Sequence, residues 1–265
     1  MLSTLILVKV MVTLVVVVGL TLIAEHVSAR LAGILAGFPH GIAIVLYFIG
    51  LEHGAVFAAT AAVAAVGGLT ANLAHAMGIA LLAPETKGWR GAMMAASGGI
   101  AVFLIVAGLL RLLAPGAGWG AVITGLAITA AWVGMRHWQE HVHVAKPRTT
   151  MAELALRAAV AAGIVITITA LAGVIGPVWA GLLSGFPVVT FPVLLLVQAR
   201  HGHAPVIGMV KAYPFGLTAL IVYTLTVSVT FPLLGIGWGT AAGLLASLLW
   251  MSLATTLRAQ ITKGS

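Results

Sequence analysis

The sequence predicts an all-α fold, a polytopic bundle of about nine transmembrane helices. Only 7% of its 265 residues are charged, whereas roughly a quarter are charged in a soluble domain. Apolar runs of about 18 residues or more recur along the chain, and each can cross roughly 30 Å of hydrocarbon. These runs are continuous and do not alternate with polar residues, so they indicate helices and not the strands of a β-barrel.

The predicted spans follow the apolar runs in order. They cover residues 4–24, 31–51, 55–83, 92–113, 118–136, 153–175, 178–199, 205–231 and 238–257. The first run has only Lys9 near its start and no convincing cleavage site, so we expect a retained helix and not a signal peptide. The third and eighth runs are too long for one perpendicular helix, and each could be a tilted helix, a broken helix or two helices. The number of spans could therefore be eight, nine or ten.

The basic residues indicate how the chain is oriented. The net charge is +8, but the basic residues lie singly or in pairs at the ends of apolar runs, which argues against a nucleic-acid partner. With nine spans they gather on one side, apart from Lys9 and Arg111, which can snorkel. The positive-inside rule then predicts a bacterial inner-membrane protein with its N-terminus outside and its C-terminus in the cytoplasm.

One polar stretch divides the chain. Residues 136–150 read RHWQEHVHVAKPRTT, and Pro147 followed by Thr149 and Thr150 indicates the start of a helix. We therefore predict a first half over 1–136, a cytoplasmic linker over 137–151 and a second half over 152–265.

The two halves carry an internal duplication at an offset of 148 residues. AGILAGFP at 32–39 matches AGLLSGFP at 180–187, and a His-Gly pair follows each motif at the same distance. Residues 31–54 share ten identities in 24 ungapped positions with their counterparts. Apolar composition alone does not easily produce GFP and HG together at one fixed spacing, so the sequence predicts two internal repeats.

The duplicated spans run in opposite directions if the chain has nine spans. The second span then points outward and its counterpart, the seventh, points inward, which is the arrangement of an inverted repeat. Gly-Trp-Gly at 118–120 resembles 237–239 at an offset of only 119, so the first half has one helix more. On that pairing the fifth and ninth spans share one direction, which conflicts with a clean inversion.

A Gly-Phe-Pro sequence lies about eight residues into each duplicated span. Proline removes a backbone donor and glycine permits a bend, so each motif predicts a break in its helix. The residues of the two breaks are Gly37, Phe38 and Pro39 in the first half and Gly185, Phe186 and Pro187 in the second. Paired breaks can frame a polar site between the halves. The alternative is two kinks packed at helix crossings.

Polar residues inside the spans provide the predicted lining of this site, because they are costly in a membrane. The set is His40, Asn72, His75, Lys211 and Tyr213. Asn72 and His75 are three residues apart and therefore share a helix face. Lys211 could hold an anionic solute, or it could lie near the inner interface and snorkel.

Catalysis and metal binding have little support. The only acids are five glutamates, and the chain has no cysteine, no P-loop and no paired carboxylates. HxxxHxH at 137–143 could bind zinc, but this set is expected in the linker with only Glu140 nearby. His53 and His201 are better explained as helix-terminal residues beside a C-terminal glycine. We expect no enzyme activity, no cofactor and no metal site.

The second half resembles the small bacterial inner-membrane proteins of the GlpM-like type. The resemblance lies in AGLLSGFP at 180–187, the turn at 200–203 and the aromatic residues Tyr213 and Tyr223; the first half is similar over 32–71. It implies a fused tandem of that unit. It implies at most a link to exopolysaccharide production and supplies no substrate or site residues.

The predicted function is transport of a small molecule or ion through a site between the two breaks, in contact with the lipid bilayer. A structural or scaffold subunit of a membrane assembly, with dry kinks and an apolar face against a partner, is the first alternative. An enzyme acting on lipid-linked substrates is the second. The sequence also allows a homo-oligomer.

Overall fold

The computed structural model describes residues 2–26, 38–85, 87–113, 116–138 and 150–261. Its described residues are helical and form no strand, which confirms the all-α prediction. The helices are α1 (Leu2–His26), α3 (His40–His53), α4 (Ala55–Leu82), α5 (Trp89–Leu113), α6 (Ala117–Gly134), the 3₁₀ turn η1 (Met135–His137), α7 (Met151–Ser184), α8 (Thr190–His201) and α9 (His203–Ile261).

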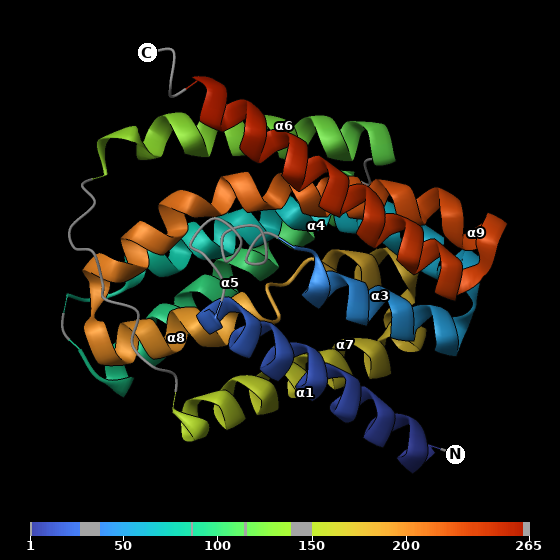
Figure 1. Ribbon diagram of the computed structural model, residues 1–265, viewed down its shortest axis with the longest axis horizontal. Helices are drawn as coiled ribbons and strands as arrows, with labels where there is room; N and C mark the ends of the chain where they lie inside the picture. Colours follow the sequence, from blue (N-terminus) through green and yellow to red (C-terminus); the bar gives the residue numbers. More distant parts are fainter. Residues whose placement is uncertain (1, 27–37, 86, 114–115, 139–149, 262–265) are drawn as a thin grey trace.

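Among the described residues, six helices are long and apolar enough to cross a membrane. They are α1, α4, α5, α6, α7 and α9, with α6 counted through η1. Helix α9 has 59 residues, which at 1.5 Å per residue is about three times the hydrocarbon thickness. It turns back on itself, as the orange and red ribbons show (Figure 1). These helices are consistent with a multi-pass membrane protein, and the count of nine spans stays a prediction.

Glycines with positive φ form the sharp turns between helical stretches. Gly54 (φ 88°) separates α3 from α4, and Gly202 (φ 82°) separates α8 from α9. Gly176 (φ 79°) divides α7 and Gly235 (φ 77°) divides α9. A side chain is strained in this left-handed region, so glycine is required for such turns.

The offset of 148 residues also relates the bounds of the helices. Helix α1 corresponds to 150–174, which is α7 up to the turn at Gly176. Helix α3 corresponds to 188–201, almost all of α8, and α4 corresponds to 203–230, the first part of α9. The turn glycines Gly54 and Gly202 are counterparts at the same offset.

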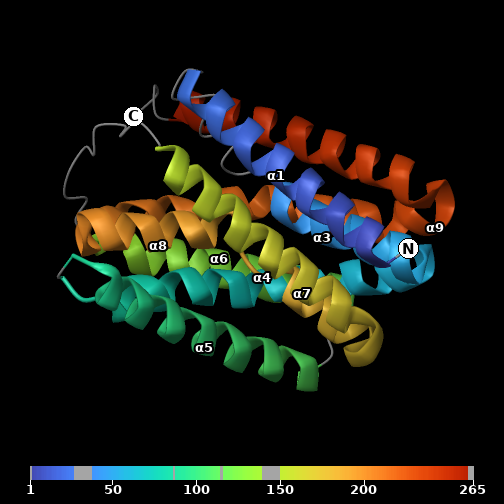
Figure 2. The same ribbon diagram turned by 90° about the horizontal axis from the view of Figure 1, so that it is seen from below.

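The turns gather at two opposite ends of the bundle. At one end, the turns at Gly54, Gly176 and Gly235 lie together. A Cβ added at Gly50 would meet Ile236, and one added at Gly173 would lie 2.9 Å from His53 Cε1. We call this the Gly54 end. At the other, the Gly202 end, the Gly88 amide donates to the Ala199 carbonyl at 2.8 Å. Helix α1 begins toward one end of the long axis and α9 ends toward the other (Figures 1 and 2).

Helix α4 lies at the centre of the core and packs against α5, α6, α7 and α9. Its buried face consists largely of alanine and glycine, which allow close helix approach in a membrane. An added Cβ at Gly181 of α7 would collide with the Ala61 carbonyl, and one at Gly68 would lie 2.6 Å from the Leu182 carbonyl oxygen. The helix that carries the second predicted break is therefore pressed directly onto α4.

Most predicted spans have a described helix over the same residues. The exceptions are the two spans with Gly-Phe-Pro. In 178–199 the helix ends at Ser184 and the next begins at Thr190. In 31–51, residues 31–37 lie outside the described residues and α3 begins at His40. The predicted linker over 137–151 likewise lies mostly outside them.

Candidate functional site

The second Gly-Phe-Pro segment connects two helix ends inside the bundle. Gly185 is buried, and an added Cβ would lie 2.7 Å from the Gly68 carbonyl carbon. The Asn72 side-chain amide of α4 donates to the Gly185 carbonyl at 2.5 Å. That carbonyl is one of those left without a helical partner where α7 ends, so Asn72 satisfies an acceptor that lipid could not.

A chain of polar contacts extends from this point to α9. The Tyr213 hydroxyl donates to Asn72 Oδ1 at 2.7 Å. Tyr213 also interacts with the side chain of Thr190, the first residue of α8. Four elements, namely α4, the Gly-Phe-Pro segment, α8 and α9, are thus joined through Asn72 and Tyr213.

His75 lies one turn further along α4, in an aromatic enclosure. Its ring centroid is 5.0 Å from that of Phe186, 5.5 Å from Phe191 and 6.4 Å from Phe103. His75 is fully buried, and neither ring nitrogen has a hydrogen-bond partner of good geometry among the described residues. Its counterpart in the second half, Tyr223, is also fully buried with no such partner for its hydroxyl.

The first Gly-Phe-Pro segment lies beside the second. Gly37 is outside the described residues, Phe38 and Pro39 precede α3, and His40 is its first residue. A Cβ added at the next residue, Gly41, would lie 3.4 Å from Val188 Cβ. The two segments are 148 residues apart in sequence and are neighbours in space. Pro39 and Pro187 are both buried.

Lys211 lies apart from these residues. Its Nζ donates to the Trp138 carbonyl at 3.0 Å, just beyond η1. Lys211 therefore helps to hold the end of α6 against α9, although Tyr213 is only two residues away. Of the predicted lining residues, the structure joins Asn72 to Tyr213 and Gly185, places His75 against Phe186, and separates Lys211.

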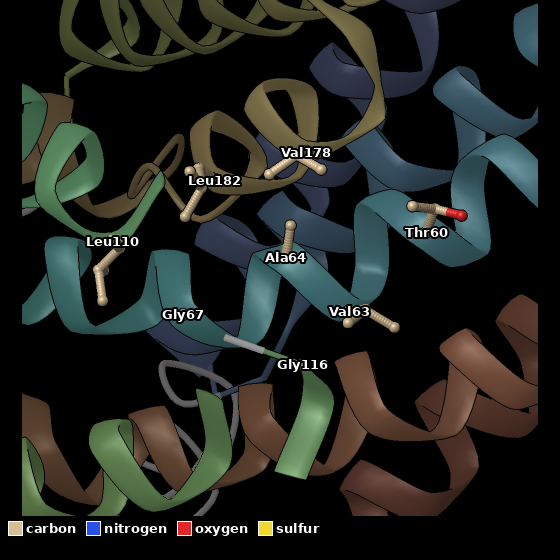
Figure 3. Close-up of a pocket in the computed structure, with 8 residues that line it drawn as sticks. All are labelled: Thr60, Val63, Ala64, Gly67, Leu110, Gly116, Val178 and Leu182. Atoms are coloured by element: carbon tan, nitrogen blue, oxygen red, sulfur yellow. The ribbon is translucent and has the colours of Figure 1, made fainter. Parts of the chain in front are cut away.

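A pocket of about 180 Å³ lies elsewhere, between α4, α5, α6 and the last turns of α7 (Figure 3). It is lined by Thr60, Val63, Ala64, Gly67, Leu110, Gly116, Val178 and Leu182. Its one hydroxyl donor, Thr60, bonds to the Val56 carbonyl of its own helix. This lining is apolar and contains none of the predicted site residues.

An ion pair between Lys9 and Glu52 lies inside the bundle near the Gly54 end. The Lys9 side chain is 4% exposed and that of Glu52 is 16% exposed. Lys9 Nζ also donates to Thr169 Oγ1 of α7 at 2.7 Å. The sequence interpretation of Lys9 as a snorkelling residue missed this pair. The signal available was the opposite charge of Glu52 at the same predicted end of the bundle.

A second ion pair lies at the Gly202 end. Arg200 Nη1 is 2.6 Å from Glu153 Oε1. Glu153 also belongs to a capping box, in which the Thr150 amide donates to Glu153 Oε2 at 2.8 Å. Glu52 and Arg200, which belong to different pairs, are counterparts at the offset of 148 residues.

Comparisons with protein-family profiles, curated proteins and solved structures find no match to this chain. The GlpM-like resemblance therefore stays a prediction. The described residues contain no group of three side chains suited to hold a metal ion, and the linker histidines His141 and His143 lie outside them.

Proposed function

We propose that this protein is a membrane transporter that moves a small molecule or ion between the two Gly-Phe-Pro segments. One observation carries the proposal: the segments are neighbours at Gly41 and Val188, and a polar network through Asn72 and Tyr213 is anchored at the second. Buried polar groups are expensive in a membrane and usually serve function. Interrupted helices at the junction of two repeats are the usual site of substrate binding in secondary transporters.

Matching burial supports the inverted repeat. Positions 91, 95, 99 and 103 of α5 are buried, and so are 239, 243, 247 and 251, their counterparts at the offset of 148 residues. This pairs α5 with the stretch after Gly235 and makes α6 the additional helix. With nine crossings, each matched pair of spans is then five crossings apart and runs in opposite directions. The conflict over the fifth and ninth spans disappears.

Charge supports the predicted orientation. The Gly202 end carries Lys87, Arg90, Arg136 and Arg200, whereas at the Gly54 end Lys9 is neutralised by Glu52 and Arg111 lies exposed in the last turn of α5. The positive-inside rule then assigns the Gly202 end to the cytoplasm of a bacterial inner membrane, with the N-terminus outside.

The burial of Pro39 and Pro187 corresponds, on this proposal, to a closed state. Alternating access requires one half to move against the other so that each end opens in turn. The small residues between α4 and α7 form the kind of smooth contact along which packed helices can slide. Transport is favoured over the scaffold alternative because Tyr213 extends the network from Asn72 to Thr190 of α8, which goes beyond satisfying the Gly185 carbonyl at a kink.

The test is uptake into proteoliposomes, measured with a panel of radiolabelled amino acids, sugars, nucleosides and organic anions. We expect saturable accumulation of at least one compound by the wild type, and its loss in Asn72→Leu. Thr167→Val is the matched control, because the Thr167 hydroxyl is exposed and bonds only within its own helix at Gly163. Absence of saturable uptake of every compound would reject transport of these four solute classes and would favour a scaffold role, unless access to the site is shown to alternate between the two ends.

A further inference from the structure

The two ion pairs occupy related places in the two halves of the chain. Lys9 of α1 pairs with Glu52 in the last turn of α3, and Glu153 of α7 pairs with Arg200 in the last turn of α8. In each half the first helix is thus tied to the short helix that follows a Gly-Phe-Pro segment. One tie lies at the Gly54 end and the other at the Gly202 end.

Stability alone does not account for the Lys9–Glu52 pair. Burial removes both charges from water, and their mutual attraction seldom exceeds that loss by much. Ionisable groups inside a membrane bundle usually mark moving or conducting parts. The Lys9 ammonium makes an additional bond to Thr169 in the opposite half, so it connects the halves as well as two helices.

We propose that the two ion pairs are alternating gates. Breaking Lys9–Glu52 releases α3 from α1 and opens the path to the Gly-Phe-Pro segments from the Gly54 end. Breaking Glu153–Arg200 releases α8 from α7 and opens the path from the Gly202 end. This inference rests on the proposed transport function, because it describes how the same site gains access to each side.

The gates differ in strength. The Arg200 side chain is 48% exposed, whereas Lys9 is 4% exposed and has a second partner. Water and salt weaken an exposed pair far more than a buried one. The resting protein therefore opens more readily at the Gly202 end than at the Gly54 end.

The chain has no cysteine, so a single introduced thiol reports whether a reagent in water can reach the Gly-Phe-Pro segments. The reporter is Val188→Cys, a buried position beside Gly41, reacted with a membrane-impermeant maleimide in right-side-out and inside-out vesicles. Lys9→Met with Glu52→Gln raises labelling from the Gly54 end about tenfold, which corresponds to about 1.4 kcal/mol. Glu153→Gln with Arg200→Gln raises labelling from the Gly202 end instead.

Single cysteines at Gly116 and Met151 identify the two ends independently of any predicted orientation. Both positions are exposed, the first at the Gly54 end and the second at the Gly202 end. The charge-swapped variant, Lys9→Glu with Glu52→Lys, returns labelling toward the wild-type rate and guards against simple misfolding. Gln at position 153 retains a capping-box residue, so α7 keeps its start.

The pattern of labelling decides the inference. Opposite responses to the two double substitutions support alternating gates. Equal labelling from both ends in either variant, or no change in both folded variants, overturns them. The labelling experiment needs no substrate, so its result is independent of the uptake assay. If the two double substitutions raise labelling from opposite ends but no compound is taken up, the gates stand and the tested solutes are rejected. If a compound is taken up but neither double substitution alters labelling, transport stands and the gates are rejected.

Discussion

Replacing Asn72 by leucine tests whether the polar network holds the second Gly-Phe-Pro segment in place. Leucine is the residue at the counterpart position 220, so its volume suits this helix face. The change removes two hydrogen bonds, one to the Gly185 carbonyl and one from the Tyr213 hydroxyl. Hydrogen bonds between membrane helices contribute about 0.6 kcal/mol on average and about 1.7 at most. Asn72→Leu should therefore lower the free energy of unfolding by about 1 to 3 kcal/mol.

The measurement is a double-mutant cycle with Tyr213→Phe, followed by reversible unfolding in mixed micelles. Tyr213→Phe removes the hydroxyl and with it the contacts to Asn72 and Thr190, so its cost should be similar to that of Asn72→Leu. The double variant should cost less than the two costs added together. The exposed control Thr167→Val should stay within about 0.5 kcal/mol of the wild type. If Asn72→Leu were as stable as that control, or if the two changes were additive, the network would not exist as described.

Two further predictions concern the helices around the site. Gly181→Ala should strongly reduce folded yield and thermal stability, because the added Cβ would collide with the α4 backbone. The control Gly163→Ala should be neutral or slightly stabilising, because nothing lies within 4 Å of its added Cβ. Equal melting temperatures of the two variants would contradict the packing of α7 on α4. Thr150→Ala should lower the free energy of unfolding by about 1 kcal/mol, because it removes the capping box of α7, whereas Thr150→Ser should retain the box. If chemical unfolding gave the wild type and both variants the same stability, the cap would be contradicted.

The local features of the chain could be predicted because they depend on neighbouring residues. Continuous apolar runs require helices in lipid, since only a helix satisfies its own backbone groups. Gly54 and Gly202 are predicted as the glycines that end helices and do form turns with positive φ, and so does Gly176, which lies between two predicted spans. The interruption at Gly185 and Pro187 also follows from local backbone chemistry, and a helix does end at Ser184.

The partners of the polar residues could not be predicted in the same way. Asn72 and Gly185 are 113 residues apart, and Lys9 and Thr169 are 160 apart. Lys211 and Tyr213 are two positions apart on one helix, which turns their side chains by about 200°; one contacts Trp138 and the other Asn72.

The sequence by itself therefore determined the membrane-like helices and the turns, and it predicts the duplication. These features arise from apolar length, glycine conformation and identity at a fixed offset. Only the tertiary structure decided that Lys9 is paired with Glu52 inside the bundle and that Lys211 lies apart from Asn72. The reason is physical: a buried charge or amide takes whichever partner the packing of distant helices brings within hydrogen-bonding distance, and no local pattern encodes that approach.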